Sequence, residues 1–563
     1  MIHLDKVTFT YRDAPGPTLE GVTLHVGPGE LALVTGSTGA GKSTLLRTIN
    51  GLVPHFSGGL LQGQVTVAGL DTRTNPPRQL AGLVGYVGQD PTAGFVSDTV
   101  EEELAYGLEQ CGLDPAVMRT RIEEVLDLLG LAELRDRDLL TLSAGQAQRV
   151  AMGAALALHP RVLVLDEPTS ALDPAAAEEV MAAIARLVQD FDMAVLMAEH
   201  RLERVVQFAD QVVLLDRQGH AVSGPPREVL ANSPVVPPVV TLGRALHWPE
   251  VPLTVREARR LAQPAIDAAL AQPAAPPASA APSGTAVPPA PCLLQARGVT
   301  VTYPGVTAVD EVDLDLAAGV VVGLMGRNGS GKSSLLWALH GAGPMHAGTV
   351  EGPLPDGAPR PRPRPRSRSA KPAAATPRPP VVLVPSQPTD LLWEDTVERE
   401  LAGTGAGAVL DLIAPGIPRA AHPRDLSEGQ RLALVLAIQL APQPAGTQPA
   451  ARPPARVIAL DEPTRGLDYT AKARLVGVLR GLAQDGHAII VASHDVEFLA
   501  AAADAVVWMA AGRIILRGPT FEVLTSVPAH APQVTKVCAP LRVATVAQAV
   551  AALQGAASGG EAT

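Results

Sequence analysis

Hydrophobic and polar residues follow one pattern that the chain carries twice. At residues 1–28 they alternate along HLDKVTFTYRD and LEGVTLHV, which predicts strands of an antiparallel layer. An unbroken apolar run, LALVT, then leads into a glycine-rich stretch and the helical pattern TLLRTINGL. The second half repeats this order, with VVGLM before SLLWALHG. Each half is therefore predicted to place a buried strand, a tight loop and a helix in succession.

Further apolar runs in both halves predict a buried sheet with helices, an α/β fold. Residues 81–88 (AGLVGYVG), VLVL and AVLM read as buried strands, and VVLV, VIAL and AIIV repeat them. After the first of these runs, apolar residues recur at helical spacing in TVEEELAYGLEQCGL and VMRTRIEEVLDLLGL. This spacing predicts a helical subdomain. The matching stretch of the second half is shorter by about one helix.

The glycine-rich loops carry the strongest chemical signal. They read GSTGAGKS and GRNGSGKS, each between a buried strand and a helix N-terminus. Glycines let backbone N–H groups turn inward around phosphate oxygens, the lysine can reach the β- and γ-phosphates, and the following serine can bind Mg²⁺. The candidate nucleotide-binding residues are Gly36, Ser37, Thr38, Gly39, Ala40, Gly41, Lys42, Ser43, Thr44, Gly326, Arg327, Asn328, Gly329, Ser330, Gly331, Lys332, Ser333 and Ser334.

Other residues recur at matching places around these loops. Tyr11 and Tyr303 precede them, as core or surface aromatics or as rings that stack on a nucleotide base; their repeated place favours stacking. Stacking tolerates any base and does not select ATP over GTP. Gln89 and Gln387 follow buried strands and face the ligand crevice expected of an open α/β sheet. Each amide can touch the Mg²⁺ shell and an attacking water.

Paired carboxylates end a buried strand in each half. Two adjacent carboxylates on an extended chain point to opposite sides, so they can do different work. Glu167 and Glu462 suit the polarisation of an attacking water, and the preceding aspartates suit the Mg²⁺ shell. The predicted metal ligands are Ser43, Gln89, Asp166, Ser333, Gln387 and Asp461.

Two further repeated features complete the set. His200 and His494 stand at strand ends, where a lone histidine is usually structural, but in this order each is predicted beside the γ-phosphate. The strings LSAGQ and LSEGQ each open a helix, where a serine either caps the helix or approaches an anion. The predicted anion-facing residues are Ser143, Gly145, Gln146, Ser427, Gly429 and Gln430.

Composition narrows the function classes. The net charge of -11 and the pI near 5.7 argue against a general nucleic-acid binder, so no nucleic acid is expected as a partner. Three scattered cysteines suit a reducing cytosol and exclude a disulfide framework or a cysteine-rich zinc site. The N-terminus does not read as a signal peptide, and no apolar run reaches the ~18 residues that span a bilayer. Work on a membrane must therefore go through a partner.

Together the motifs resemble the nucleotide-binding domains of ABC ATPases, over roughly residues 1–230 and 292–525. The resemblance implies ATP and Mg²⁺, and two tandem P-loop domains, each with a RecA-like parallel-sheet core, an antiparallel β layer and a helical subdomain. It also implies that the halves pair head-to-tail, with each ATP held by the P-loop of one half and the LSxGQ signature of the other. Both sites are then expected to hydrolyse ATP, although Glu428 brings a carboxylate near one phosphate.

The first half resembles the ATPases of energy-coupling-factor (ECF) importers, through Asn50–Thr72, Asp90–Leu113 and Ala198–Val206. This implies an integral membrane coupling protein and a substrate-binding membrane subunit as partners. The cargo would be a vitamin, a vitamin precursor, or nickel or cobalt ions. The protein would lie at the cytoplasmic face of the cell membrane. A tandem ATPase of a sugar-type importer, and a soluble tandem ABC protein that works on ribosomes, stay open as alternatives.

The expected domain boundaries follow from motif and composition. Residues 1–262 form a first ATPase domain with a helical extension, and 263–291 a Pro/Ala-rich linker. Residues 292–540 form the second domain and 541–563 a C-terminal tail. The arginine-rich stretch 357–380 is expected to be a disordered basic insertion, with contact to anionic lipid as an alternative.

Overall fold

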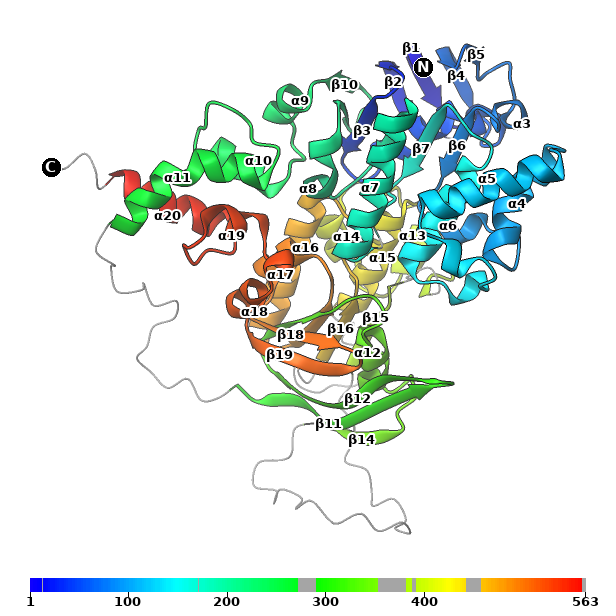
Figure 1. Cartoon of the computed structure of the whole chain (residues 1–563). Helices are drawn as coiled ribbons and strands as arrows, with labels where there is room; N and C mark the ends of the chain where they lie inside the picture. The colour runs from blue at the N-terminus through cyan, green and yellow to red at the C-terminus, as the bar shows by residue number, and fades with distance from the viewer. Residues whose placement is uncertain are drawn as a thin grey trace. The chain divides into compact units, whose positions relative to one another are not determined.

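The computed structural model describes residues 1–12, 14–170, 172–271, 290–352, 381–386, 391–441 and 457–558. They form two compact units, shown in Figure 1. The first comprises Met1–Gln263 with Gly466–Thr470, and the second Pro264–Arg465 with Ala471–Thr563. Most of the expected linker, the basic insertion at 357–380 and Gln387 lie outside the described residues.

An antiparallel sheet forms one layer of the first unit, as the alternating pattern predicts. Strand β1 (Ile2–Thr10) pairs with β2 (Leu19–Val26) on one side and β4 (Leu60–Val67) on the other. Strand β5 (Leu70–Asp71) continues the sheet beyond β4. The burial pattern of β2 alternates, so one face of the layer packs on the core and the other faces solvent.

A mixed sheet lies at the centre of the first unit. Its described strands run parallel, except that β10 joins the edge antiparallel to β9. In spatial order they are β10 (Ala221–Gly224), β9 (Gln211–Leu215), β3 (Leu31–Gly36), β8 (Ala194–Ala198), β7 (Val162–Asp166) and β6 (Val84–Val87). Strands β3, β7 and β8 are buried along their whole length, which explains their unbroken apolar runs. Their carboxyl ends meet at one edge of the sheet, where a ligand crevice is expected.

The second unit repeats this arrangement. Its antiparallel layer has β11 (Cys292–Tyr303) between β12 (Val306–Ala317) and β14 (Ala347–Glu351). Its mixed sheet has the same order of parallel strands with one antiparallel edge. The strands are β15 (Val381–Val384), β16 (Val457–Asp461), β17 (Ala488–Ala492), β13 (Val321–Met325), β18 (Ala505–Ala510) and β19 (Arg513–Pro519).

Helices alternate with these strands along the chain. In the first part of the chain they are α1 (Lys42–Ile49), α2 (Leu52–His55), α3 (Pro77–Leu80), α4 (Val100–Gln110), α5 (Pro115–Leu128), α6 (Ala144–Leu156), α7 (Pro174–Phe191), α8 (Leu202–Val205), α9 (Pro226–Asn232), α10 (Pro238–Ala245) and α11 (Val255–Ala271). The later ones are α12 (Lys332–His340), α13 (Val397–Leu401), α14 (Gly407–Ile413), α15 (Glu428–Leu440), α16 (Tyr469–Gln484), α17 (Val496–Ala502), α18 (Thr520–Ser526), α19 (Gln533–Cys538) and α20 (Val546–Ser558).

Helix α1 lies between the two sheets of the first unit and joins them into one core. It contacts β4 of the antiparallel layer and β3, β7 and β8 of the parallel sheet. Leu45, Leu46 and Ile49 are buried in the same cluster as Phe9 and Val164. The loop before α1 is therefore anchored from both layers.

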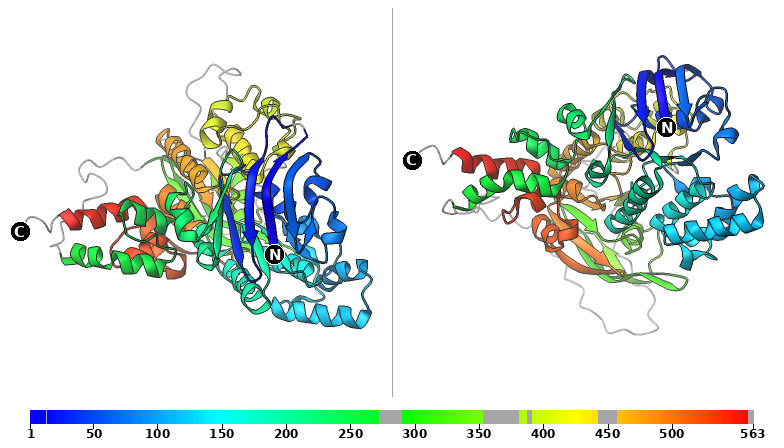
Figure 2. Two further views of the ribbon diagram at one scale, coloured as in Figure 1. Left: turned by 90° about the horizontal axis from the view of Figure 1, so that it is seen from above. Right: turned by 45° about the horizontal axis from the view of Figure 1, so that its top comes forward.

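The helical subdomain of the second unit is shorter by about the length of one helix, as the sequence predicts. Helices α4, α5 and α6 form this subdomain in the first unit, and the views in Figure 2 show α4 and α5 (cyan) apart from the antiparallel strands (blue). The second unit keeps counterparts of all three, but α13 and α14 have 5 and 7 residues where α4 and α5 have 11 and 14. The shortening is thus shared between two helices.

No helix within the described parts of the chain is long and apolar enough to cross a membrane.

Packing in the subdomain gives a direct test of this core. A Cβ added to Gly153 in α6 would lie 2.8 Å from Leu104 Cδ2 and 2.9 Å from Val125 Cγ1, whereas one added to Gly107 in α4 meets nothing closer than 3.7 Å. We expect Gly107→Ala to raise stability by up to ~1 kcal/mol because alanine favours helix. Gly153→Ala should lower it, since overpacking costs ~1–3 kcal/mol. Thermal unfolding of both variants checks this, and equal shifts would contradict it.

Candidate functional site

The glycine-rich loops have the backbone that phosphate binding requires. Gly41 has φ 94° and Gly331 φ 99°, a left-handed conformation that glycine adopts without strain. A Cβ on Gly41 would lie 2.9 Å from the Thr18 carbonyl oxygen, and one on Gly331 only 2.0 Å from that of Ala308. Neighbouring backbone therefore excludes any side chain at these two positions.

The lysines of the loops fold back over them. Lys42 Nζ donates to the carbonyl oxygens of Gly36 (3.1 Å) and Ser37 (3.2 Å). Lys332 Nζ does the same, to Gly326 at 2.7 Å and to the next residue at 3.1 Å. Burial lowers the pKa of Lys42, and the nearby carboxylates of Glu167 and the residue before it oppose that change. Each ammonium group is thus held at the loop, where it can meet a phosphate oxygen.

A serine from α1 or α12 meets the aspartate at the end of the neighbouring strand. The Ser43 hydroxyl lies close enough to Asp166 to lower the pKa of that carboxyl, and Ser333 does the same for Asp461. Burial, followed by the charge of Glu167, raises the pKa of Asp166 to about 6. Burial likewise raises the pKa of Asp461 to about 6. The structure therefore brings together the predicted serine and aspartate ligands of each site.

The glutamates depart from the extended geometry that the sequence suggested. Strand β7 ends at Asp166, and Glu167 has φ 53°; Glu462 has φ 50° after β16. A left-handed backbone is strained for a glutamate and persists only where its surroundings hold it. The Glu167 N–H donates to the Ala198 carbonyl (2.9 Å) and the Glu462 N–H to that of Ala492 (2.8 Å). The expectation of two residues on an extended chain was wrong, because the glutamate turns at the strand end.

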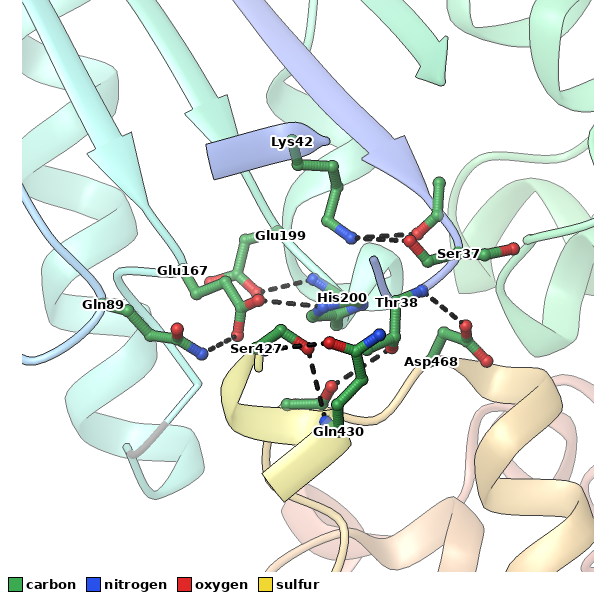
Figure 3. Close-up of polar contacts among 12 residues, drawn as sticks. Ser37, Thr38, Lys42, Gln89, Glu167, Glu199, His200, Ser427, Gln430 and Asp468 are labelled. Atoms are coloured by element: carbon green, nitrogen blue, oxygen red, sulfur yellow. Dashed lines mark hydrogen bonds and ion pairs between the residues drawn. The ribbon is translucent and has the colours of Figure 1, made fainter. Parts of the chain in front are cut away.

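Each glutamate is paired with the histidine of the next strand. His200 Nε2 lies 2.8 Å from Glu167 Oε1, and His494 Nδ1 lies 2.8 Å from Glu462 Oε2. All four side chains are largely buried. The amide of Gln89 donates to Glu167 Oε2 at 3.3 Å, so Figure 3 shows this carboxylate between an amide and an imidazole. Such a carboxylate can accept a proton from water while its neighbours fix its orientation.

The signature serines cap their helices, one of the two alternatives considered for them. Ser143 Oγ accepts from the Gln146 N–H (3.3 Å), and Gln146 Oε1 accepts from the Ser143 N–H (2.9 Å). Ser427 and Gln430 form the same capping box with the same distances (Figure 3). Each hydroxyl accepts in this box and keeps its own proton to donate. An approach to an anion stays a prediction, and the side chain of Glu428 lies outside the described residues.

The two tyrosines are placed differently. The hydroxyl of Tyr11 lies 3.0 Å from Thr44 Oγ1 in α1, and its ring packs edge-on against Phe9. The side chain of Tyr303 is 44% exposed. Stacking on a base stays a prediction for both, and Tyr11 in addition ties the antiparallel layer to the loop helix.

The sequence motifs did not single out one buried carboxylate at this site. Glu199 precedes His200 at the end of β8 and is fully buried. It accepts two hydrogen bonds from Thr169, which follows Glu167 by two residues. The sequence could have indicated Glu199, because it is a charged residue that directly follows the apolar run AVLMA. It does not recur in the second half, where serine stands at the matching position, so the repeat does not single it out.

Comparison with known proteins agrees with this geometry. The profile of the ABC transporter family matches residues 19–170 and 309–465. An ABC transporter ATP-binding protein of Streptomyces avermitilis is 51% identical over 586 residues, which cover 98% of this chain and 100% of the relative. One of Methanosarcina mazei is 30% identical over 556 residues, covering 93% and 90%. The solved structure of an RNase-L inhibitor covers 93% of this chain and 95% of its own, with TM-score 0.54 and 18% identity, which is a likeness in fold.

These matches confirm the predicted fold of two ABC-type P-loop ATPase domains. The profile covers the glycine-rich loop and the paired carboxylates of each half, and the relatives extend over nearly the whole chain. The chain therefore belongs to the ABC transporter family and is an ABC-type ATPase.

Proposed function

We propose that this ATPase is the motor subunit of an importer of the energy-coupling-factor type, peripheral to the cytoplasmic face of the cell membrane. It couples ATP binding and hydrolysis to the uptake of a vitamin, a vitamin precursor or a transition-metal ion. The stretches Asn50–Thr72, Asp90–Leu113 and Ala198–Val206 support the importer type through their resemblance to that family. The observation that carries the motor function is the pairing of a strained glutamate with a histidine in both units.

In this proposal both units hydrolyse ATP. Glu167 and Glu462 take the proton of the attacking water, because each is an ionisable group oriented by a buried histidine at 2.8 Å. Gln89 orients the same water in the first unit, and Gln387 is proposed for this role in the second. The loop N–H groups and lysines bind the β- and γ-phosphates and stabilise the charge that develops during transfer.

The residues present also fit a Mg²⁺ ion. The hydroxyl and carboxylate oxygens of the Ser43–Asp166 and Ser333–Asp461 pairs are hard ligands that this ion prefers. Asp461 Oδ1 is buried without a hydrogen-bond partner among the residues described, so a cation would satisfy it. When bound, Mg²⁺ neutralises charge on the β- and γ-phosphates.

The two halves are proposed to work as a head-to-tail pair within one chain. Each ATP would lie between the P-loop of one half and the signature of the other, which contributes the Ser143 or Ser427 hydroxyl. We propose residues 1–262 and 292–540 as the ATPase domains, 263–291 as the linker and 541–563 as a tail. A linker that joins the halves raises their effective concentration.

Each unit exposes one apolar side chain on a fixed backbone, and this supports the proposal that a protein partner binds there. In the first, Glu103 accepts from the consecutive N–H groups of Val96 and Ser97, both at 3.0 Å. In the second, Glu400 accepts from Trp393 (2.5 Å) and the next residue (2.7 Å). The side chains of Val96 and Trp393 are 61% and 83% exposed although their backbone is fixed. We propose that an integral membrane coupling protein covers the exposed side chains of Val96 and Trp393. A substrate-binding membrane subunit would complete the complex.

Hydrolysis itself is tested by removing both bases. Glu167→Gln with Glu462→Gln should bind a fluorescent ATP analogue as the wild type does. It should release phosphate at least ~100-fold more slowly, because the proton acceptor is lost while the binding groups remain. Glu228→Gln changes an exposed glutamate of α9 and is the matched control. Turnover near that of the wild type in the double variant would refute the assigned role.

The buried aspartates predict that the stability of the protein depends on pH when it is measured with a metal chelator and without nucleotide. A carboxyl whose pKa is raised contributes stability below its unfolded pKa, and this is lost as pH rises through the folded value of about 6. The free energy of unfolding of Asp166→Asn should therefore exceed that of the wild type, by roughly 3 kcal/mol near pH 8 and by less near pH 5, which thermal unfolding measures. Mg²⁺ with ATP analogue should stabilise the wild type more than the variant.

A surface aspartate is the control for this pH dependence. The hydrogen bond from Arg73 lowers the pKa of Asp71, so its contribution is present above the unfolded pKa and lost as pH falls. Asp71→Asn should lower stability near pH 8, the opposite sign to Asp166→Asn. The assignment of Asp166 fails if both variants shift in the same direction.

The partner is tested by purifying the protein from its own membranes in detergent, with mass spectrometry. We expect a small coupling protein and integral binding proteins to copurify. Val96→Ser combined with Trp393→Ser should recover several-fold less of them, because both exposed apolar side chains are lost. Val222→Ser removes an apolar side chain that is 61% exposed elsewhere and should have no effect. A pair of large permeases would favour the sugar-type importer, and ribosomal proteins the soluble class.

A further inference from the structure

Glu199 closes a ring of contacts around the candidate base of the first unit. Its Oε1 accepts from the Thr169 N–H (2.7 Å) and hydroxyl (2.6 Å), and its Oε2 accepts from the His200 N–H (3.1 Å). His200 in turn pairs with Glu167 at 2.8 Å. Figure 3 shows the side chains of Glu167, Glu199 and His200 converging between the ends of β7 and β8. The two loops that carry the base and the histidine are thereby joined through one buried carboxylate.

Arg204 belongs to the same network. Its guanidinium donates to the carbonyl oxygens of Thr169 (3.1 Å) and Leu172 (3.3 Å). Burial raises the pKa of Glu199, while the bonds from Thr169 and the charge of Arg204 oppose that rise. A fully buried carboxylate is costly unless it is hydrogen-bonded, so its presence needs an explanation.

The second unit replaces both charged members of this network. Ser493 precedes His494 where Glu199 precedes His200, and Phe498 stands where Arg204 stands. Ser493 Oγ lies 3.3 Å from Thr464 Oγ1 and donates to Glu462 Oε2 at 3.4 Å, both near the limit of a hydrogen bond. In the first unit the Glu199 carboxylate bonds backbone N–H groups beside the base, whereas in the second the Ser493 hydroxyl contacts the base itself.

We propose that Glu199 is a positioning residue of the first ATP site, and that it makes the first site the faster of two unequal sites. This rests on the proposed ATPase roles of Glu167 and His200. Glu167 has a left-handed backbone at φ 53°, which requires its surroundings to hold it. The bond from the Glu167 N–H to Ala198 holds this turn, as the bond from Glu462 to Ala492 does in the second unit, and in the first unit Glu199 adds a further tie through Thr169 and His200. Without it the base drifts from the attacking water, which lowers turnover and leaves ATP binding intact.

The test compares Glu199→Ala with wild type in steady-state hydrolysis of Mg²⁺–ATP. We expect kcat to fall about fivefold or more, with KM within about twofold and unchanged binding of a fluorescent ATP analogue. Because a coupled pair can lose more than half of its turnover when either site fails, Glu167→Gln alone should in addition lower kcat more than Glu462→Gln alone if the first site is the faster one. A kcat at or above half of the wild-type value would overturn the proposal. So would a fall in which KM and binding of the analogue are lost as well.

Two further variants separate position from charge and from folding. Glu199→Gln keeps the length of the side chain and one acceptor oxygen for Thr169, but its NH2 group cannot accept from the His200 N–H. It should therefore retain more of kcat than Glu199→Asp, which keeps the charge but is too short to reach Thr169. The reverse order would overturn the proposal, and this pair decides if Glu199→Ala does not fold. Ser233→Ala removes a buried hydroxyl that bonds Val235 and should leave kcat unchanged. If wild type does not hydrolyse ATP, or if Glu167→Gln with Glu462→Gln does so normally, the proposed function itself fails.

Discussion

The structure depends on acidic groups that are buried at the end of one strand in each unit. Asp166 and Glu167 are each less than a tenth exposed, and Asp461 is equally buried. Ionised groups in such places must be paired, because burial removes them from water. The lysine and serine of the loop, the histidine of the next strand and, in the first unit, Gln89 all face them. The need to satisfy these carboxylates thus draws several strand ends into one site.

The internal repeat shows which parts of this arrangement can vary. Loops, parallel strands, strained glutamates and histidine partners recur in both units, whereas the restraints behind them differ. In the first unit Glu199 bonds the His200 N–H and Arg204 bonds the Thr169 carbonyl, whereas the second has Lys472 paired with Asp495 at 2.7 Å. Duplicated sites with the same catalytic groups can therefore be tuned apart through their supports.

Much of the fold could be predicted because its signals are local. Unbroken apolar runs such as those of β3 and β7 mark buried parallel strands, and alternation in β1 and β2 marks a layer with one solvated face. The length of the helices in the second subdomain was harder to predict, since a count of missing residues does not say which helix loses them. The strand predicted at residues 81–88 is also shorter, at Val84–Val87.

The sequence by itself determined the two glycine-rich loops, the strand ends that carry chemistry and the family, because these are short patterns of residue type at fixed spacing. Only the tertiary structure decided how the groups meet. The turn of Glu167 into a left-handed backbone depends on hydrogen bonds from another strand, and so does its pairing with His200. Glu199 is the clearest case, because its role can be inferred only from its hydrogen bonds to Thr169, which lies 30 residues away along the chain.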